Sequence, residues 1–278
     1  MSTYGTVDHH VRVAHEVEDA GWDGFFTWDG ISIGDADTWD PWVLLGAVAA
    51  STRRVALGAL VFPLARRRPW KVAREALTVD HLSHGRLVLP VGLGVLDDGG
   101  FGRVSGEAAE LRVRAEQVDE ALAILERAWT GEAFSFSGRH HTVDGLVIAP
   151  RPVQRPRVPV WPVAGLGSRR SMRRAARWDG AVLQTIGEER PLTPSEVAGA
   201  VAMLGELREE LRADGHVLSD TFDVVVQGEL PTDAVHAREH LSALAEAGAT
   251  WWVEARWDPR TAGPDAILGL ARQGPPGT

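Results

Sequence analysis

Short runs of apolar residues alternate along the chain with longer segments in which apolar residues recur every three or four positions. The short runs have the length and composition of β-strands, and the spacing in the longer segments predicts amphipathic helices. The predicted strands span residues 22–28, 55–62, 86–92, 158–164, 180–184, 222–228 and 250–255. Because helical segments separate these strands, the pattern predicts β–α units around a parallel sheet.

The number of predicted strands, seven, is one short of a closed barrel. A (β/α)8 barrel pairs every strand edge, whereas seven strands leave two edges unpaired. The chain opens on a predicted helix, TVDHHVRVAHEVEDAG, which ends at Gly21. We therefore expect an α/β barrel whose first strand is absent from this chain, because the start codon was placed too late or because the barrel is incomplete. An open doubly wound sheet is the alternative architecture.

A long connection joins the third and fourth predicted strands. It contains the short alternating run FSFSG and then HHTVDG, which predict a small β-hairpin before a proline-rich approach to the next strand. No internal repeat or low-complexity linker divides the chain, so residues 1–278 are expected to form a single domain.

Composition narrows the class of partner. A net charge of −9 disfavours binding to nucleic acid or to an anionic membrane. The absence of cysteine excludes disulfides, thiol nucleophiles and thiolate metal sites, and it fits a cytoplasmic protein. The start of the sequence lacks the apolar region of a signal peptide, and no apolar run approaches the length of a membrane span, so we expect neither.

A basic cluster follows the second predicted strand. In a barrel the site lies at the carboxyl ends of the strands, so Arg66, Arg67 and Arg68 would stand where an anionic ligand or substrate docks. A solvated basic loop is the alternative, because charge clusters are usually exposed.

A glycine-containing turn follows the fourth predicted strand. It comprises Gly165, Leu166, Gly167 and Ser168 and leads directly into a helical segment. Small residues let backbone N–H groups approach an anion, and the helix N-terminus adds partial positive charge. The spacing departs from the dinucleotide fingerprint because Arg170 stands at the third glycine position. The turn therefore predicts a mononucleotide-like phosphate site, with a merely tight turn as the alternative.

Two carboxylates and one histidine motif are candidates for chemistry. Asp29 follows the first predicted strand and Glu254 ends the last, where each could relay a proton or instead pair with an arginine. The motif HAREH, residues 236–240, matches a zinc-peptidase pattern, but a helix of the outer ring carries it, so no metal is expected. Several of the eleven tryptophans lie near strand ends, where they could enclose a planar ring or fill the core.

Longer segments of the chain resemble one family. EDAGWDGFFTWD, the stretch from DPWVLLGAVAAS to VLPVGLG, PVWPVAG and AGATWWVEARW are similar to segments of the bacterial luciferase-like flavin-dependent oxidoreductases. The likeness spans nearly the whole chain. It implies a (β/α)8 TIM barrel that binds reduced FMN, or the related 8-hydroxy-5-deazaflavin coenzyme of the F420 type, at the carboxyl face.

The resemblance also implies cofactor-binding residues. GALVFP matches the stretch behind the flavin ring, where a non-proline cis peptide is frequent, and Ala59–Leu60 is the candidate bond. The turn at residues 165–168 matches the phosphate-holding turn, assisted by Arg170 or Arg174.

Asp29 matches the position after the family's second strand, but Gly30 replaces the histidine that usually follows. The replacement removes a plausible proton donor, which leaves the reaction on the substrate open.

The first hypothesis is a flavin-dependent oxidoreductase that monooxygenates a small organic substrate with reduced FMN and O2, with Asp29 and Glu254 as catalytic candidates. Hydride transfer with the deazaflavin coenzyme is the alternative. A flavin-binding barrel without turnover and a metal hydrolase are further possibilities, the latter supported only by HAREH. The resemblance implies a small-molecule substrate, a separate flavin reductase as partner for the FMN reaction, and a homodimer as an assembly to test.

Overall fold

The fold is described by a computed structural model that covers residues 4–34, 36–188, 190–258 and 260–276. The helices are α1 (Val7–Asp19), α2 (Pro41–Ser51), α3 (Pro69–Leu82), α4 (Gly99–Gly102), α5 (Leu111–Ala128), α6 (Arg169–Ala176), α7 (Pro194–Ala213), α8 (Ala234–Glu246) and α9 (Pro264–Gln273), with a 3-10 turn η1 (Leu64–Arg66). The strands are β1 (Gly24–Thr27), β2 (Ala56–Ala59), β3 (Phe62–Pro63), β4 (Leu89–Gly92), β5 (Phe134–Ser137), β6 (Thr142–Leu146), β7 (Val160–Gly165), β8 (Gly180–Gln184), β9 (Asp223–Gly228) and β10 (Trp251–Glu254). Within the ranges covered, none of the helices combines the length and the apolarity that a bilayer crossing requires.

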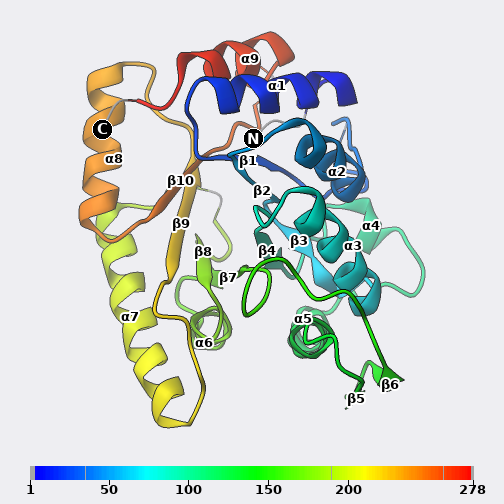
Figure 1. Ribbon diagram of the computed structural model, residues 1–278. Helices are drawn as coiled ribbons and strands as arrows, with labels where there is room; N and C mark the ends of the chain where they lie inside the picture. The colour runs from blue at the N-terminus through cyan, green and yellow to red at the C-terminus, as the bar shows by residue number, and fades with distance from the viewer. Residues whose placement is uncertain (1–3, 35, 189, 259, 277–278) are drawn as a thin grey trace.

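The wall of the barrel consists of parallel strands in the order β1, β2, β4, β7, β8, β9 and β10. A bridge between Leu57 and Leu87 joins β2 to the segment before β4, and the short β3 continues beyond β2 and pairs with β4. Helices surround the strands, with α7 and α8 on one side and α2 and α3 on the other (Figure 1). Each of the seven predicted strands is present. The prediction of a barrel is therefore confirmed, and the alternative, an open doubly wound sheet, is wrong.

The predicted hairpin is also present. β5 and β6 pair in antiparallel fashion between α5 and β7. The carboxylate of Glu120 on α5 accepts hydrogen bonds from the backbone N–H groups of Arg139, His140 and His141, at 2.6 to 3.1 Å. These bonds tie the hairpin turn to α5, in the helix layer outside the barrel wall.

The cis peptide bond expected at Ala59–Leu60 is found one residue later, at Leu60–Val61, so the predicted position is wrong. β2 remains in register with β1 through Ala59, and the Leu60 N–H still donates to the Thr27 carbonyl at 2.9 Å. The Ala59–Leu60 amide is therefore held in the regular ladder, and the chain leaves the ladder only at the next peptide.

Side chains on the strands alternate between the barrel interior and the helix layer. The interior cluster takes one residue from each wall strand or its immediate flank: Phe26, Leu60, Val88, Trp161, Val182, Val225 and Val253. The intervening residues of β8 and β9, such as Leu183 and Val226, pack instead against α6, α7 and α8. Because successive strand residues point to opposite faces, this parity assigns a direction to every wall position, including those at the site.

The two edges of the wall, β1 and β10, make no ladder with each other among the described residues. The Trp251 ring on β10 lies beside the Phe26 ring on β1, with centroids 6.2 Å apart, so aromatic packing spans this part of the barrel. Outside it, α1 and α9 lie side by side (Figure 1), and the Trp22 indole donates to the Ala271 carbonyl at 2.9 Å. The described part of the chain thus has the seven-stranded wall predicted from the sequence.

The first turn of α1 contains a buried histidine that makes stability depend on pH. Burial, with a smaller contribution from the neighbouring His9, lowers the pKa of His10 to about 4. The unfolded chain takes up this proton near pH 6.5, so stability is unaffected above that pH and falls by about 3 kcal/mol as the pH drops to about 4. Urea denaturation at about pH 7 and about pH 4.5 measures this effect. Between these two pH values, His10→Gln is expected to lose less free energy of unfolding than the wild type. His15→Gln, an exposed change on the same helix, should keep the wild-type pH dependence. Equal losses for all three proteins would contradict this role of His10.

Candidate active site

The inner residues at the carboxyl ends of the strands form the floor of the candidate site. Strand register places Gly165 beside Gln184, and extending the β8–β9 register by two residues places Gln184 beside Gln227. Both glutamines share the inward parity of Val182 and Val225, and both are half-buried. Val253 follows on β10, paired with Gln227. These floor residues thus include two neutral amides and no ionisable side chain.

The turn at residues 165–168 has the geometry expected of a phosphate cradle. Gly167 has φ +82°, and a Cβ added at this glycine would meet no atom within 4 Å, so the space above the turn is open to a ligand. Ser168 caps α6, its hydroxyl accepting from the Ser171 N–H at 3.3 Å. Among the described residues no acceptor is found for the N–H groups of Gly167, Arg169 and Arg170. These donors are therefore available to an anion.

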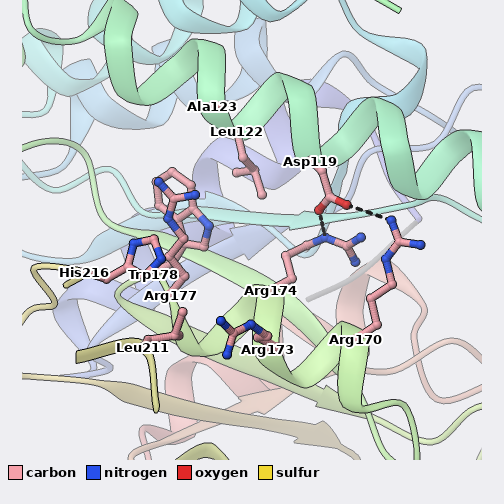
Figure 2. A pocket seen from close by; sticks show the side chains of 10 residues that line it. All are labelled: Asp119, Leu122, Ala123, Arg170, Arg173, Arg174, Arg177, Trp178, Leu211 and His216. Carbon is pink, nitrogen blue, oxygen red and sulfur yellow. Dashed lines mark hydrogen bonds and ion pairs between the residues drawn. The ribbon is translucent and has the colours of Figure 1, made fainter. Parts of the chain in front are cut away.

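Arg170 and Arg174, predicted to assist this turn, are directed elsewhere. Figure 2 shows both side chains converging on Asp119 of α5. The Arg174 Nε lies 2.5 Å from one carboxylate oxygen and an Arg170 Nη lies 3.3 Å from the other. The two arginines join α6 to α5 on the outside of the barrel, so the structure does not bring them to the turn at residues 165–168.

A hollow of about 280 Å³ lies next to this ion pair, on the outer surface between α5, α6 and the end of α7 (Figure 2). Apolar side chains, among them Leu122, Trp178 and Leu211, line it together with arginines of α6. The arginines have carboxylate partners around the rim: Arg173 contacts Asp214 and Arg177 contacts Glu126, both at 2.8 Å. Because this hollow lies between helices of the outer layer, we assign it no role in the reaction.

The basic cluster after β2 neutralises buried carboxylates. The Asp29 carboxylate, whose side chain is fully buried, contacts Arg66 at 2.9 Å and Arg67 at 2.7 Å. A second Nη of Arg66 contacts Asp98 in the loop after β4. Arg68 is exposed and lies over the Trp70 ring, 6.0 Å from its centroid. Arg66 and Arg67 therefore hold three strand-end loops together, which leaves only Arg68 of the predicted anion loop unpaired with a carboxylate in the described structure.

Asp98 is the centre of the loop after β4, and sequence reasoning missed it. Burial acts to raise its pKa, but hydrogen bonds from the N–H groups of Gly100 and Ser32, together with Arg66, outweigh burial and hold the pKa below its ordinary value. Its carboxylate also caps α4 by accepting from the Gly100 N–H at 2.9 Å. Asp98 is thus a charged anchor between the loops after β1 and β4. The aspartate before α4 was the available signal, as an N-cap residue.

Glu254 faces away from the barrel interior. Its neighbour Val253 points inward, so Glu254 shares the outward parity of Trp252, whose indole donates to it at 3.2 Å. The carboxylate also accepts from the Leu230 N–H at 3.0 Å and pairs with Arg256 at 2.8 Å. The structure therefore does not bring Glu254 and Asp29 together at the floor of the site, and both carboxylates hold loops.

Trp28 occupies the space above Gly30. The ring lies at the end of β1, and a Cβ at Gly30 would lie 2.5 Å from it. The Trp257 ring, which follows β10, meets Trp28 edge to face with centroids 5.7 Å apart. Any side chain larger than that of glycine at position 30 would thus require the Trp28 ring to move.

Arg114, in the first turn of α5, is a buried cation without a carboxylate partner among the described residues. It is 4% exposed, it donates to the Gly94 carbonyl at 2.6 Å, and its Nε is buried with no hydrogen-bond partner. Burial alone lowers its pKa.

The strands and helices around Arg114 place the loop that it contacts beside the loop after β7. Val91 pairs with Pro162, so the loops after β4 and β7 begin side by side, and Arg174 of α6 contacts the Ala115 carbonyl of α5. These contacts place α5 beside α6, while the Arg114 guanidinium itself lies against the Leu93 and Gly94 carbonyls of the loop after β4. Sequence reasoning missed Arg114 as well, because no motif spacing marks an arginine on a helix as a partner of a distant loop.

The HAREH segment lies on α8, in the outer layer. His236 contacts Asp233, the N-cap of that helix, at 2.9 Å, and the His240 ring meets Trp252 edge to face. In the part of the chain that the structure describes, no cluster of three or more histidine, aspartate or glutamate side chains could hold a metal ion.

The fold and this site define a class: a (β/α) barrel with a glycine turn at the carboxyl end of one strand, leading directly into a helix. The model of the luciferase-like monooxygenase family matches residues 1–255, and the chain belongs to that family. The F420-dependent glucose-6-phosphate dehydrogenase of Beutenbergia cavernae is 30% identical over 239 residues, 84% of this chain and 66% of that protein. The protein of the same name from Nakamurella multipartita is 29% identical over 233 residues, 81% of this chain and 64% of the relative. The chain thus spans about two thirds or less of the length of these relatives.

Solved structures share the fold at low sequence identity. An F420-dependent secondary alcohol dehydrogenase, in complex with an F420–acetone adduct, aligns with TM-score 0.79 and 16% identity over 98% of this chain and 93% of its own. The FMN-bound oxygenating constituent of 3,6-diketocamphane monooxygenase from Pseudomonas putida aligns with TM-score 0.72 and 14% identity, over 97% and 92% of the two chains. The luciferase-like TIM-barrel fold inferred from the sequence is therefore confirmed.

Proposed function

We propose that this protein is an oxidoreductase that uses the deazaflavin coenzyme F420 to transfer hydride to or from a small organic substrate. Relatives that are about 30% identical carry the name of F420-dependent dehydrogenases, which favours this reaction over FMN-dependent monooxygenation. The chain's own support is a glycine turn at the carboxyl face together with a buried arginine that has no carboxylate partner among the described residues.

The residues present fit a coenzyme with a phosphoryl group. The orphaned Nε of Arg114 and the open N–H groups at the start of α6 are donors of the kind that a phosphoryl oxygen accepts from. A buried guanidinium without a counter-charge is costly, and an anionic ligand would offset that cost. Arg114 and the backbone N–H groups of Gly167, Arg169 and Arg170 would hold the phosphoryl end.

When bound, the coenzyme supplies two-electron chemistry: an alcohol is oxidised to a carbonyl compound by transfer of hydride from carbon to the deazaflavin, with the hydroxyl proton released to water. The chain's part is binding and orientation. Trp28 and Trp257 shield one side of the opening, and Arg66 holds the loops after β1, β2 and β4 in one arrangement. Since Asp29 and Glu254 are paired, neither is assigned a proton-transfer role.

Reduced FMN with O2 is the second candidate, favoured by the family's description as monooxygenases. The test compares both reactions on one preparation. Oxidised F420 is incubated anaerobically with a panel of alcohols, and loss of its visible absorbance is followed; in parallel, reduced FMN is supplied with O2 and carbonyl substrates, and oxygenated product is measured. We expect reduction of F420 and no oxygenated product. Oxygenation with FMN and no reduction of F420 would overturn the proposal, as would binding without turnover in both arms.

A further inference from the structure

The floor of the candidate site carries uncharged hydrogen-bonding groups on two neighbouring strands. Gln184 and Gln227 are the last inward residues of β8 and β9 and lie side by side in the extended register. Their amides make no side-chain hydrogen bond within the described residues, although both side chains are half-buried. Polar side chains in such positions usually have partners, so these amides are available to a ligand.

The largely buried charged groups around this floor are paired with one another, whereas Arg68, after β2, is exposed and has no carboxylate partner among the described residues. Arg66 and Arg67 pair with Asp29, Arg66 also pairs with Asp98, and Arg256 pairs with Glu254. A phosphorylated substrate would need unpaired cations to offset the loss of water around its charge. The buried Arg114, which has no carboxylate partner among the described residues, lies at the loop after β4 and is assigned to the proposed coenzyme.

Exposed apolar side chains gather in the loops above the floor. Large apolar side chains remain exposed in the loops that follow four different wall strands: Ile31 at 55%, Leu96 at 48%, Ile186 at 61% and Trp257 at 47%. Ile186 lies above Gly165, since a Cβ on that glycine would be 2.8 Å from its side chain. Because the carboxyl ends of parallel strands share one rim, these residues lie at the same end of the barrel. Apolar surface gathered at an opening is typical of a ligand-binding site.

We propose that the substrate is an uncharged, largely apolar alcohol or carbonyl compound, whose oxygen is hydrogen-bonded by the amides of Gln184 and Gln227. The inference rests on the proposed function and names its substrate class. A glutamine amide accepts from a hydroxyl and donates to a carbonyl, so the same pair serves the alcohol and its oxidised product. A sugar phosphate, the substrate in the name of the relatives above, does not fit this surface.

The experiment first measures the affinity for oxidised F420 by fluorescence titration, which tests the proposed function alone. Turnover is then measured with apolar secondary alcohols, such as cyclohexanol, and with glucose 6-phosphate. We expect kcat/KM to be higher for the alcohols by about tenfold or more, the discrimination that one unmet charge or hydrogen bond supplies. A preference for glucose 6-phosphate would overturn the substrate class while leaving the proposed function intact, whereas failure to bind F420 would overturn both.

Variants then test the two amides. Gln184→Leu and Gln227→Leu are each expected to lower kcat/KM for the preferred alcohol about tenfold, the effect of losing one hydrogen bond, with an unchanged Kd for F420. Gln184→Glu keeps the shape of the side chain and replaces only its amide group. It should also lower kcat/KM, which would show that the effect does not come from altered packing. Gln273→Leu, exposed on α9, is the matched control with wild-type values. Weaker F420 binding with unchanged kcat/KM for the alcohol would assign the amides to the coenzyme and contradict the proposal.

Discussion

Replacing Arg66 by methionine is expected to destabilise the protein by about 3 to 5 kcal/mol, because it leaves buried carboxylates without their counter-charge. The Arg66 side chain is 6% exposed and contacts both Asp29 and Asp98, whose side chains are 0% and 2% exposed. Arg67 still pairs with Asp29 in the variant, so Asp98 bears most of the loss. The measurement is the free energy of unfolding in urea at about pH 7, where carboxylates are ionised.

Arg68→Met is the matched control for this prediction. It removes another arginine of the same loop. Arg68 is exposed and lies over Trp70, and it has no carboxylate partner in the described structure. An exposed substitution of this kind is expected to change stability by less than about 0.5 kcal/mol. Equal, small effects of Arg66→Met and Arg68→Met would mean that the cluster after β2 is a solvated basic loop, contrary to the ion pairs described above.

Replacing Arg114 by methionine is expected to weaken F420 binding about 10- to 100-fold, the range expected for the loss of a charge-assisted hydrogen bond. The same change should leave the free energy of unfolding equal or higher, because it removes a buried cation that has no carboxylate partner among the described residues. A loss of F420 affinity without a loss of stability distinguishes a ligand-binding arginine from a structural one. The Kd comes from fluorescence titration of F420, and stability from urea denaturation without the coenzyme.

Arg112→Met serves as the control because Arg112 lies on the same helix, is 53% exposed and pairs with Glu116 at 2.7 Å. It should retain the wild-type Kd. A stability loss of about 2 kcal/mol or more in Arg114→Met, the size expected for a buried structural contact, with an unchanged Kd, would show that Arg114 supports the fold and would remove it from the proposed site.

The regular part of the fold could be predicted from the sequence because its signal is local. Apolar runs bounded by turn residues located the wall strands, and their alternation with helical periodicity indicated a barrel. The turn at 165–168 could likewise be found, because glycine in a left-handed conformation and a serine cap are local requirements, here at Gly167 and Ser168.

The sequence did not reveal where the side chains of the site point. Their direction depends on which face of its strand each residue occupies and on partners that are distant in the sequence. Glu254 ends a strand, as predicted, but the strand phase turns it outward beside Trp252. The inward amides Gln184 and Gln227 carry no charge and belong to no motif, so only the strand phase reveals them. Asp29 meets Arg66 and Arg67 across 37 and 38 residues of sequence, a separation that no local pattern reports.

Our central proposal is that the carboxyl end of this barrel binds a deazaflavin coenzyme through the turn at 165–168. A crystal structure of the protein with oxidised F420 tests it most directly. We predict a phosphoryl oxygen within hydrogen-bond distance of the Arg169 or Arg170 N–H and of the Arg114 guanidinium, with the ring system above Gln184. Coenzyme bound instead in the hollow between α5 and α6, or a phosphoryl group placed away from Gly167, would contradict it.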